Sequence, residues 1–226
     1  MGSVELTLPW EDRISAAVRD GERRVEPFRG KAETIRTSDE LPQDAAVAAA
    51  CLSGNLQGYE RLYRWQGTRM KNLARNLLSS QSDAEDAVQE TFLKIQRSIS
   101  SFRGQSAFVT WTFRILVNTC HDLRRRRARR KDQVNEDVDE LSPRMELRAP
   151  GSHPSLRMAL ERALAKLTAH QRDVFLLYEV EGFRHAEIAG MLAISETASK
   201  NTLFQAKKNL RTMLEPPRSS ATGGAQ

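Results

Sequence analysis

The sequence predicts an all-α protein with two small helical domains joined by a flexible linker. No segment alternates apolar and polar residues over the length of a strand, which argues against a sheet. Residues 44–130 contain no proline and only four glycines, so long helices can form there. Residues 132–154 are acidic and contain Pro143, Pro150 and Pro154, as expected of a linker between two helical blocks.

Outside the two helical blocks the composition indicates little regular structure. The first 43 residues combine scattered charge, weak periodicity and three prolines, and the last twelve are rich in Gly, Pro and Ser. We therefore expect a mostly disordered N-terminal extension (1–43), a first helical domain (44–131), the linker (132–154), a second helical domain (155–214) and a disordered tail (215–226).

The composition also argues against several classes of protein. No run of 18 apolar residues exists, and the N-terminus lacks the pattern of a signal peptide, so we expect a cytoplasmic protein with no membrane span. Cys51 and Cys120 have no CxxC or metal-ligand spacing, and in a reducing cytosol we expect both to be small buried hydrophobes. The sequence indicates no metal site, no cofactor and no catalysis.

Charge is strongly segregated along the chain, which has a net charge of +6. Residues 1–44 carry seven Lys or Arg and ten Asp or Glu, a net of −3. Residues 97–131 carry ten Lys or Arg and one acid, Asp122, a net of +9. This asymmetry favours a polyanionic partner for the basic segment.

An acidic helix is predicted around residues 82–96. Ser82 and Glu85 have the spacing of a capping box, and acids in the first turn are favoured by the helix dipole. At 100° per residue, the buried side is expected to consist of Ala84, Val88, Phe92, Ile95 and Ile99.

The opposite side of this helix carries acids that capping does not explain. Asp83, Asp86 and Glu90 cluster there, with Leu93 beside them and Gln89 at the flank. A protein-docking surface has this character, and a merely solvated face is the alternative. A Mg²⁺ or acid–base site would need further ligands from elsewhere, and no such constellation stands out.

The basic segment also contains aromatic residues. Phe102-Arg103-Gly104 should break the helix, and a new helix should run from about Ser106 to about Arg127. Aromatic rings among cations suit single-stranded nucleic acid, through base stacking and phosphate attraction. The alternative is that Phe108, Trp111 and Ile115 are core residues, which leaves Phe102 as the better stacking candidate. The run Arg124–Arg127 favours phosphate contact.

The C-terminal block predicts a helix-turn-helix. A short helix over 186–192 is followed by a turn at 193–195 and a helix to about Met213. Such a motif places the N-terminal half of its second helix in the major groove, although an ordinary helical hairpin with a solvated face is the alternative. The buried side of the second helix is expected to be Ser199, Leu203, Ala206 and Leu210, and the polar, basic side Thr197, Lys200, Asn201, Phe204, Gln205 and Lys208.

Together these blocks resemble the sigma-70 family of bacterial transcription initiation factors, specifically its compact extracytoplasmic-function (ECF, group IV) type. The similarity covers roughly residues 44–131 and 155–212. Region 2.2 of the family is matched by DAEDAVQETFLKI, and regions 2.3 and 2.4 by SFRGQSAFVTWTFRILVNTCHDLRRR. Region 4 is matched by LTAHQRDVFLLYEVEGFRHAEIAGMLAIS followed by SKNTLFQAKKNLR.

The resemblance implies a sigma factor that binds core RNA polymerase, through the β′ clamp and the β flap, and directs promoter recognition and melting. It also implies that an anti-sigma factor holds the protein inactive. No insertion into a membrane is expected. The acidic helix would dock on the clamp through Asp83, Glu85, Asp86, Gln89, Glu90 and Leu93. The melted −10 strand would meet Phe102, Arg103, Gln105, Ser106, Phe108, Thr110, Trp111, Arg114, Asn118, Arg124 and Arg125. The −35 duplex would meet Arg184, Thr197, Ser199, Lys200, Asn201, Phe204, Gln205 and Lys208.

Two departures from the family pattern stand out. The recognition helix lacks two cations that are common in the family, and Gln205 stands where arginine is frequent, which puts the usual −35 sequence in doubt. The N-terminal extension is longer than the compact type needs. A free-standing helix-turn-helix regulator is the alternative function, but it would leave the acidic helix and the aromatic loop without a task. A carboxylate-dependent nuclease lacks converging ligands.

Overall fold

The structure, a computed structural model, describes residues 40–133 and 154–214. These ranges contain helices and no strand, which confirms the all-α prediction. The expected N-terminal extension, most of the linker and the tail lie outside the described residues. The elements are α2 (Glu40–Leu52), α3 (Leu56–Leu78), α4 (Gln81–Ser98), a 3₁₀ turn η1 (Ile99–Ser101), α5 (Phe108–Gln133), α6 (Pro154–Lys166), α7 (Ala169–Phe175), a π-helical turn η2 (Leu176–Val180), α8 (His185–Leu192) and α9 (Glu196–Leu214).

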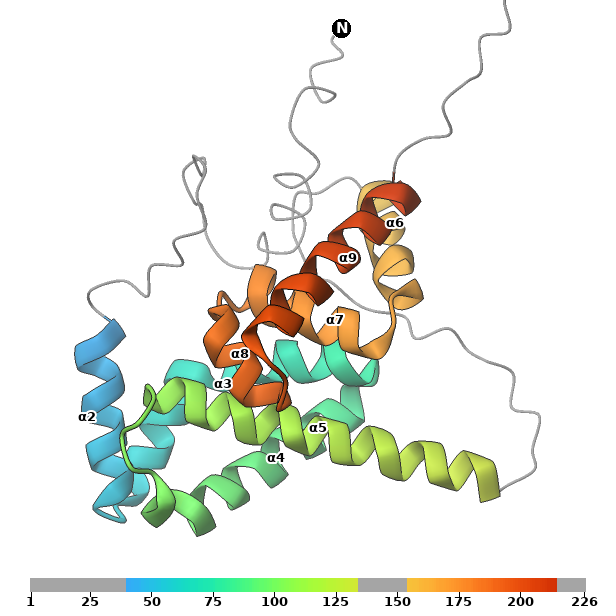
Figure 1. The fold of residues 1–226 in the computed structure, drawn as a ribbon. Helices are drawn as coiled ribbons and strands as arrows, with labels where there is room; N and C mark the ends of the chain where they lie inside the picture. Colours follow the sequence, from blue (N-terminus) through green and yellow to red (C-terminus); the bar gives the residue numbers. More distant parts are fainter. Residues whose placement is uncertain (1–39, 134–153, 215–226) are drawn as a thin grey trace, which may run out of the picture.

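Helices α2 to α5 form the N-terminal domain (Figure 1). α3 begins after Asn55, whose side-chain oxygen accepts the N–H of Gln57 at 2.9 Å, and it ends at Ser79, where φ is +56°. The left-handed residue reverses the chain, so α4 packs back along α3 and α5 packs against both. On α4 the predicted inner residues Ala84, Val88 and Ile95 are buried.

The start of α4 corrects the predicted capping box. The N-cap is Ser80, whose Oγ accepts the N–H of Asp83 at 3.3 Å, and not Ser82. Because Ser79 turns the chain, Ser80 is already extended and serves as the N-cap, two residues earlier than the sequence spacing suggested. Glu85 instead accepts a hydrogen bond from the amide of Gln81 at 2.9 Å.

Helices α6 to α9 form the C-terminal domain. α7 opens with a capping box in which Thr168 Oγ1 accepts the N–H of Gln171, and the Gln171 side chain accepts the N–H of Thr168. α8 and α9 form the predicted helix-turn-helix, with Ala193 at φ +55° in the turn. The predicted inner side of α9 is buried in full: Ser199, Leu203, Ala206 and Leu210.

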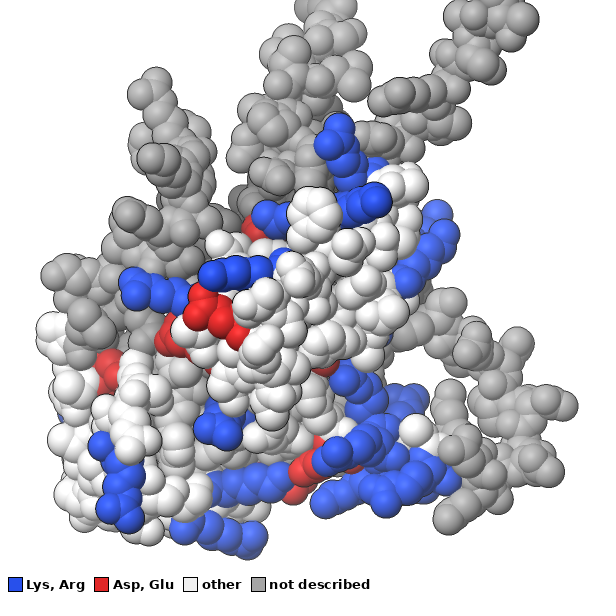
Figure 2. Space-filling view, viewed as in Figure 1, with Lys and Arg blue, Asp and Glu red and all other residues white. Residues whose placement is uncertain are grey.

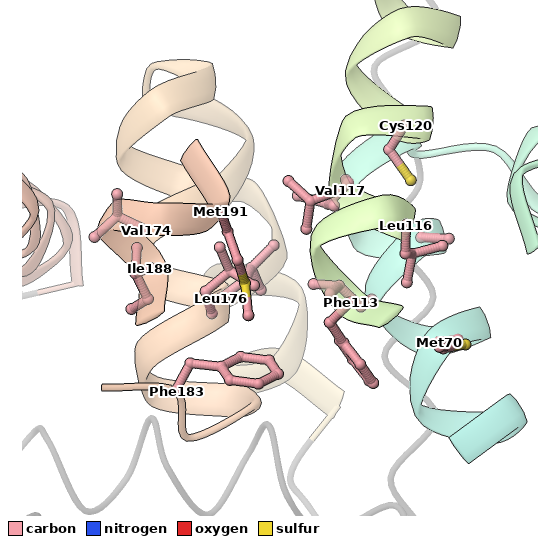
Figure 3. Packing of buried hydrophobic residues seen from close by; sticks show 14 of the residues in the cluster. Met70, Phe113, Leu116, Val117, Cys120, Val174, Leu176, Phe183, Ile188 and Met191 are labelled. Carbon is pink, nitrogen blue, oxygen red and sulfur yellow. The ribbon is translucent and has the colours of Figure 1, made fainter. Parts of the chain in front are cut away.

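The two domains pack against each other through a shared apolar layer. Phe113 and Val117 of α5 face Phe183 and Met191 of the C-terminal domain (Figure 3). The rings of Phe113 and Phe183 lie 5.2 Å apart between centroids, and both side chains are buried. A buried side chain of this size contributes about 1.5–3 kcal/mol, so this layer stabilises the contact between the domains.

Both cysteines are buried, which confirms the sequence prediction. Burial raises the pKa of Cys51 to about 11 and that of Cys120 to about 12, because it disfavours the thiolate. The thiolate is the reactive form, so both side chains are inert at neutral pH and serve as small packing groups.

Candidate nucleic-acid interface

The outer face of α4 combines exposed polar groups with an exposed leucine. Asp86 and Gln89 are exposed, and Leu93 is 51% exposed. Within the described part of the chain, Asp86 forms no ion pair, whereas Asp83 pairs with Arg127 at 3.0 Å and Glu90 pairs with Lys94 at 3.0 Å. The predicted acidic face is therefore divided into an outward part around Asp86 and Leu93 and a part that is engaged within the molecule.

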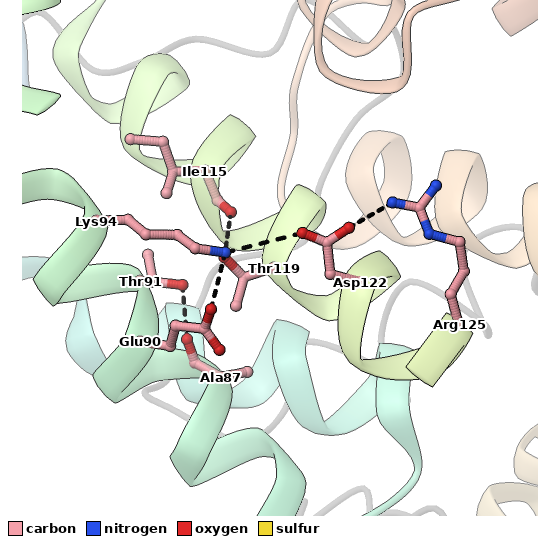
Figure 4. A network of polar contacts seen from close by, with 8 residues as sticks. All are labelled: Ala87, Glu90, Thr91, Lys94, Ile115, Thr119, Asp122 and Arg125. Atoms are coloured by element: carbon pink, nitrogen blue, oxygen red, sulfur yellow. Dashed lines mark hydrogen bonds and ion pairs between the residues drawn. The ribbon is translucent and has the colours of Figure 1, made fainter. Parts of the chain in front are cut away.

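Glu90 belongs to a polar network that joins α4 to α5 (Figure 4). Lys94 Nζ lies 3.0 Å from Glu90, donates to Thr119 Oγ1 at 3.1 Å and lies 3.9 Å from Asp122. Asp122 in turn pairs with Arg125. The network fixes the acidic helix against the basic helix, so a change at Glu90 disturbs the packing of α4 on α5 as well as the surface.

The basic run forms the projecting end of α5. Lys and Arg side chains gather over the C-terminal half of this helix (Figure 2). Residues 125–130 are exposed. Arg126, Arg129 and Arg130 form no ion pair with any described residue, so their charges are available to a partner. Such a cationic surface suits the phosphates of a nucleic acid.

The loop before α5 exposes polar side chains, whereas its aromatic ring, that of Phe102, is only half-exposed. Arg103, Gln105 and Ser106 are exposed, and Gly104 has φ +68°, a conformation that favours glycine. Phe102 is half-buried, with its ring 5.1 Å from Phe108 and 5.5 Å from Trp111 between centroids.

Phe108 is fully buried, which favours the core alternative for this residue over base stacking. The helix begins at Phe108, two residues later than predicted. Further along α5, Arg114 and Asn118 are exposed on the surface, as a DNA contact requires. Thr110, by contrast, is buried and donates from Oγ1 to Glu187 of α8 at 2.6 Å.

All six residues predicted on the outer side of α9 are exposed. Phe204 is 66% exposed, an unusual setting for a phenylalanine, and Lys200 forms an ion pair with Glu196 at 2.6 Å. Ser199 is the exception among the expected −35 contacts: it is fully buried, and its Oγ lies 2.9 Å from His185 Nδ1. Arg184 is exposed at the start of α8. The exposed set on α9 is Thr197, Lys200, Asn201, Phe204, Gln205 and Lys208.

A buried carboxylate of the C-terminal domain holds two side chains of α5. Asp173 is 1% exposed, lies 2.8 Å from His121 Nε2 and accepts from Arg124 at 3.1 and 3.3 Å. Burial alone would raise the pKa of Asp173, but the hydrogen bonds from His121 and Arg124 outweigh it and lower that pKa. Asp173 therefore remains charged at neutral pH, and Arg124 is occupied by protein.

A second buried carboxylate, that of Glu181 in the C-terminal domain, binds a side chain of the N-terminal domain. Arg69 of α3 donates to the Glu181 side chain at 3.2 Å and to the Glu181 carbonyl at 3.0 Å. Burial raises the pKa of Glu181, and the charge of Arg69 opposes that rise. The sequence did not predict the roles of Asp173, Glu181 and Arg69. A signal was present, because Asp173 and Glu181 stand at the two ends of the apolar run DVFLLYEVE, and an acid buried with such a run needs a cationic partner.

Residues 40–133 and 154–214 contain neither a membrane-spanning helix nor a cluster of metal ligands. No helix in these ranges is long and apolar enough to cross a bilayer. No group of three or more His, Cys, Asp or Glu side chains in them converges as metal ligands would.

Comparison with known families matches both domains separately. Residues 62–130 match the model for Sigma-70 region 2, and residues 157–210 match the model for Sigma-70, region 4. The chain is 30% identical over 171 residues to the ECF RNA polymerase sigma factor SigM of Mycobacterium tuberculosis, which covers 76% of this chain and 84% of SigM. It is 30% identical to the ECF RNA polymerase sigma-E factor of Haemophilus influenzae, over 71% of this chain and 91% of that protein.

Solved structures of two sigma factors have a similar fold. CnrH, solved in complex with the cytosolic domain of CnrY, superposes with a TM-score of 0.57 at 26% identity and covers 76% of this chain and 96% of CnrH. The sigma factor RpoE of Bartonella quintana, solved with the anti-sigma factor NepR, gives a TM-score of 0.53 at 24% identity over 80% of this chain and all of RpoE. The second likeness supports the fold.

Proposed function

The chain belongs to the extracytoplasmic-function group of the sigma-70 family, whose members bind core RNA polymerase and direct promoter-specific initiation, and we propose which of its surfaces carries out each step. The observation that carries the assignment is the separation of three exposed surfaces on one molecule. They are the outer face of α4, the loop and outer face of α5, and the outer face of α9.

The outer face of α4 is the polymerase-docking surface. Asp86, Gln89 and Leu93 are exposed together, and Asp86 has its charge available to an external cation. Protein interfaces combine such an apolar centre with a polar rim. Glu90 and Asp83 contribute chiefly by fixing α4 to α5 through Lys94 and Arg127.

Two surfaces take DNA. The exposed loop residues Arg103, Gln105 and Ser106, with Arg114 and Asn118 of α5, are placed to hold the melted −10 strand, and the arginines at the end of α5 hold phosphates. On α9, Asn201 and Gln205 can pair with adenine edges in the −35 duplex. Phe204 can contact a thymine methyl there, which accounts for its exposure.

The packed domains must separate before both DNA elements are bound. The −10 and −35 elements lie about 25 base pairs apart, or ~85 Å of duplex. Two small domains in contact measure only ~40 Å across. In the packed arrangement Asp173 also occupies Arg124. We therefore expect the free chain to bind promoter duplex poorly, and core polymerase to favour the open arrangement.

Site-specific crosslinking tests the three surfaces at once. p-Benzoylphenylalanine is placed at residue 93, 103 or 204 of the full chain, and the polymerase–promoter complex is irradiated. Residue 93 should crosslink to the β′ subunit, residue 103 to the non-template strand at −10, and residue 204 to the −35 duplex. Exposed Ala165 of α6 is the control position and should crosslink to no DNA. A DNA crosslink from residue 93, or exchanged targets for 103 and 204, would refute the assignment.

Further features follow from membership of this group. We infer that the protein acts in the cytoplasm without catalysis of its own and that an anti-sigma factor regulates it; RpoE of Bartonella quintana was solved in complex with the anti-sigma factor NepR. The alternative of a free-standing helix-turn-helix regulator is not favoured. Such a regulator has no use for a Sigma-70 region 2 domain, which residues 62–130 match.

A further inference from the structure

The N-terminus of α5 has no local cap. Ala107 precedes Phe108 and offers no side-chain acceptor, and Ser106 Oγ donates to the carbonyl of Ala107 at 3.3 Å. Phe108 and Val109 are 0% and 7% exposed, so water cannot readily satisfy their backbone N–H groups. A helix start of this kind needs an acceptor from elsewhere.

Asp44 of α2 supplies that acceptor from a distance of more than sixty residues in sequence. Its Oδ2 accepts the N–H of Phe108 at 2.7 Å, and its Oδ1 accepts the N–H of Val109 at 2.8 Å. Both bonds are short and charge-assisted, and the carboxylate lies at the positive end of the helix dipole. Figure 1 shows the loop before α5 running beside α2.

α2 is itself held rigidly, so Asp44 is a fixed support. At Gly58 of α3 the two helices approach so closely that an added Cβ would lie 2.6–2.7 Å from backbone atoms of Ala50 and Cys51. Val47 and Cys51 are buried on the inner side of α2, and Tyr59 Oη donates to the carbonyl of Cys51 at 3.4 Å.

We propose that Asp44 is a positioning residue for recognition of the melted −10 strand. By holding the first two backbone N–H groups of α5, it sets the direction in which the helix leaves the loop at 102–107. That direction places the exposed Arg103, Gln105 and Arg114 side chains relative to one another. Asp44 touches no DNA itself. The inference rests on the proposed function of the α5 surface.

The test compares Asp44→Ala with Val47→Ala in the full chain bound to core polymerase. Val47 lies on the same helix and is buried, so its truncation lowers stability while leaving the cap intact. The probe is a promoter, selected by the wild-type holoenzyme from a randomised library and supplied with a pre-opened bubble. The measured quantity is the ratio of affinities for the selected −10 base and a substituted base, at a temperature well below both melting transitions.

Asp44→Ala is expected to reduce this ratio about tenfold, the discrimination that one good base contact provides, with core affinity unchanged. Val47→Ala should leave the ratio unchanged at a comparable loss of thermal stability. Asp44→Asn retains one acceptor oxygen and should fall between wild type and Asp44→Ala. Full discrimination by Asp44→Ala, or equal losses in Asp44→Ala and Val47→Ala, would overturn the proposal. A wild-type holoenzyme that selects no promoter would instead refute the proposed function.

Discussion

Replacing Asp86 by lysine and Leu93 by alanine together is expected to weaken binding to core polymerase about a hundredfold, or ~3 kcal/mol. Leu93 is half exposed in the free protein, and burying such a side chain in an interface contributes ~1.5–3 kcal/mol. Asp86 has no ion-pair partner among the described residues, so its charge is available to a cation of the polymerase. Reversing that charge adds repulsion to the lost contact.

The measurement is the dissociation constant of the fluorescently labelled chain with purified core polymerase. Glu60→Lys is the matched control, because Glu60 is an exposed carboxylate on α3 and its reversal changes the net charge equally. Glu90 is unsuitable for this purpose, since a lysine there would face Lys94 and disturb the packing of α4 on α5. Unchanged affinity in the double variant, with the helical content of wild type, would contradict the docking assignment.

Replacing Asp173 by alanine is expected to separate the two domains in the free protein. The substitution leaves His121 and Arg124 of α5 without their shared partner. Removing one member of a buried charge pair typically costs about 3–5 kcal/mol, which is a large share of a small interdomain contact. All the hydrogen bonds that Asp173 makes from its side chain lead to the other domain, so each domain should stay folded.

Energy transfer between dyes on Gln96→Cys of α4 and Ala165→Cys of α6 reports the separation, because both positions are exposed and the two native thiols are buried and unreactive. Transfer should fall in the Asp173→Ala protein, and binding to promoter duplex without polymerase should strengthen. Glu179→Ala is the control: Glu179 pairs with Lys207 inside the C-terminal domain at 2.8 Å, so its loss should not change the transfer. Equal transfer in Asp173→Ala and wild type would show that Asp173 does not hold the domains together.

Short-range patterns predicted most of the fold. Helical periodicity gave the buried sides of α4 and α9, and the turn at 193–195 gave the helix-turn-helix, because these features depend on residues three or four apart. The N-cap of α4 was missed because Ser80 and Ser82 are both good caps, and the left-handed Ser79 decided between them.

Contacts between distant segments could not be predicted. Nothing near Phe108 in sequence indicates that Asp44 caps it, apart from the absence of any local cap. In the same way, periodicity predicted that Ser199 is buried, but not that its hydroxyl lies 2.9 Å from His185 Nδ1, and burial removes Ser199 from the expected −35 contacts. Thr110 is buried against Glu187, and Arg124 is bound by Asp173, because the two domains pack together. The periodicity of a single helix does not predict such contacts.

Run-off transcription with purified core polymerase tests the central claim most directly. The template is a promoter selected from a randomised duplex library by polymerase together with this chain. A discrete transcript should form only when both proteins are present, and replacing either the −10 or the −35 element should abolish it. The opposite result is a chain that binds duplex DNA and alters transcripts started by another sigma factor, but never supports initiation with core polymerase itself. That result would contradict its assignment as the promoter-recognition subunit.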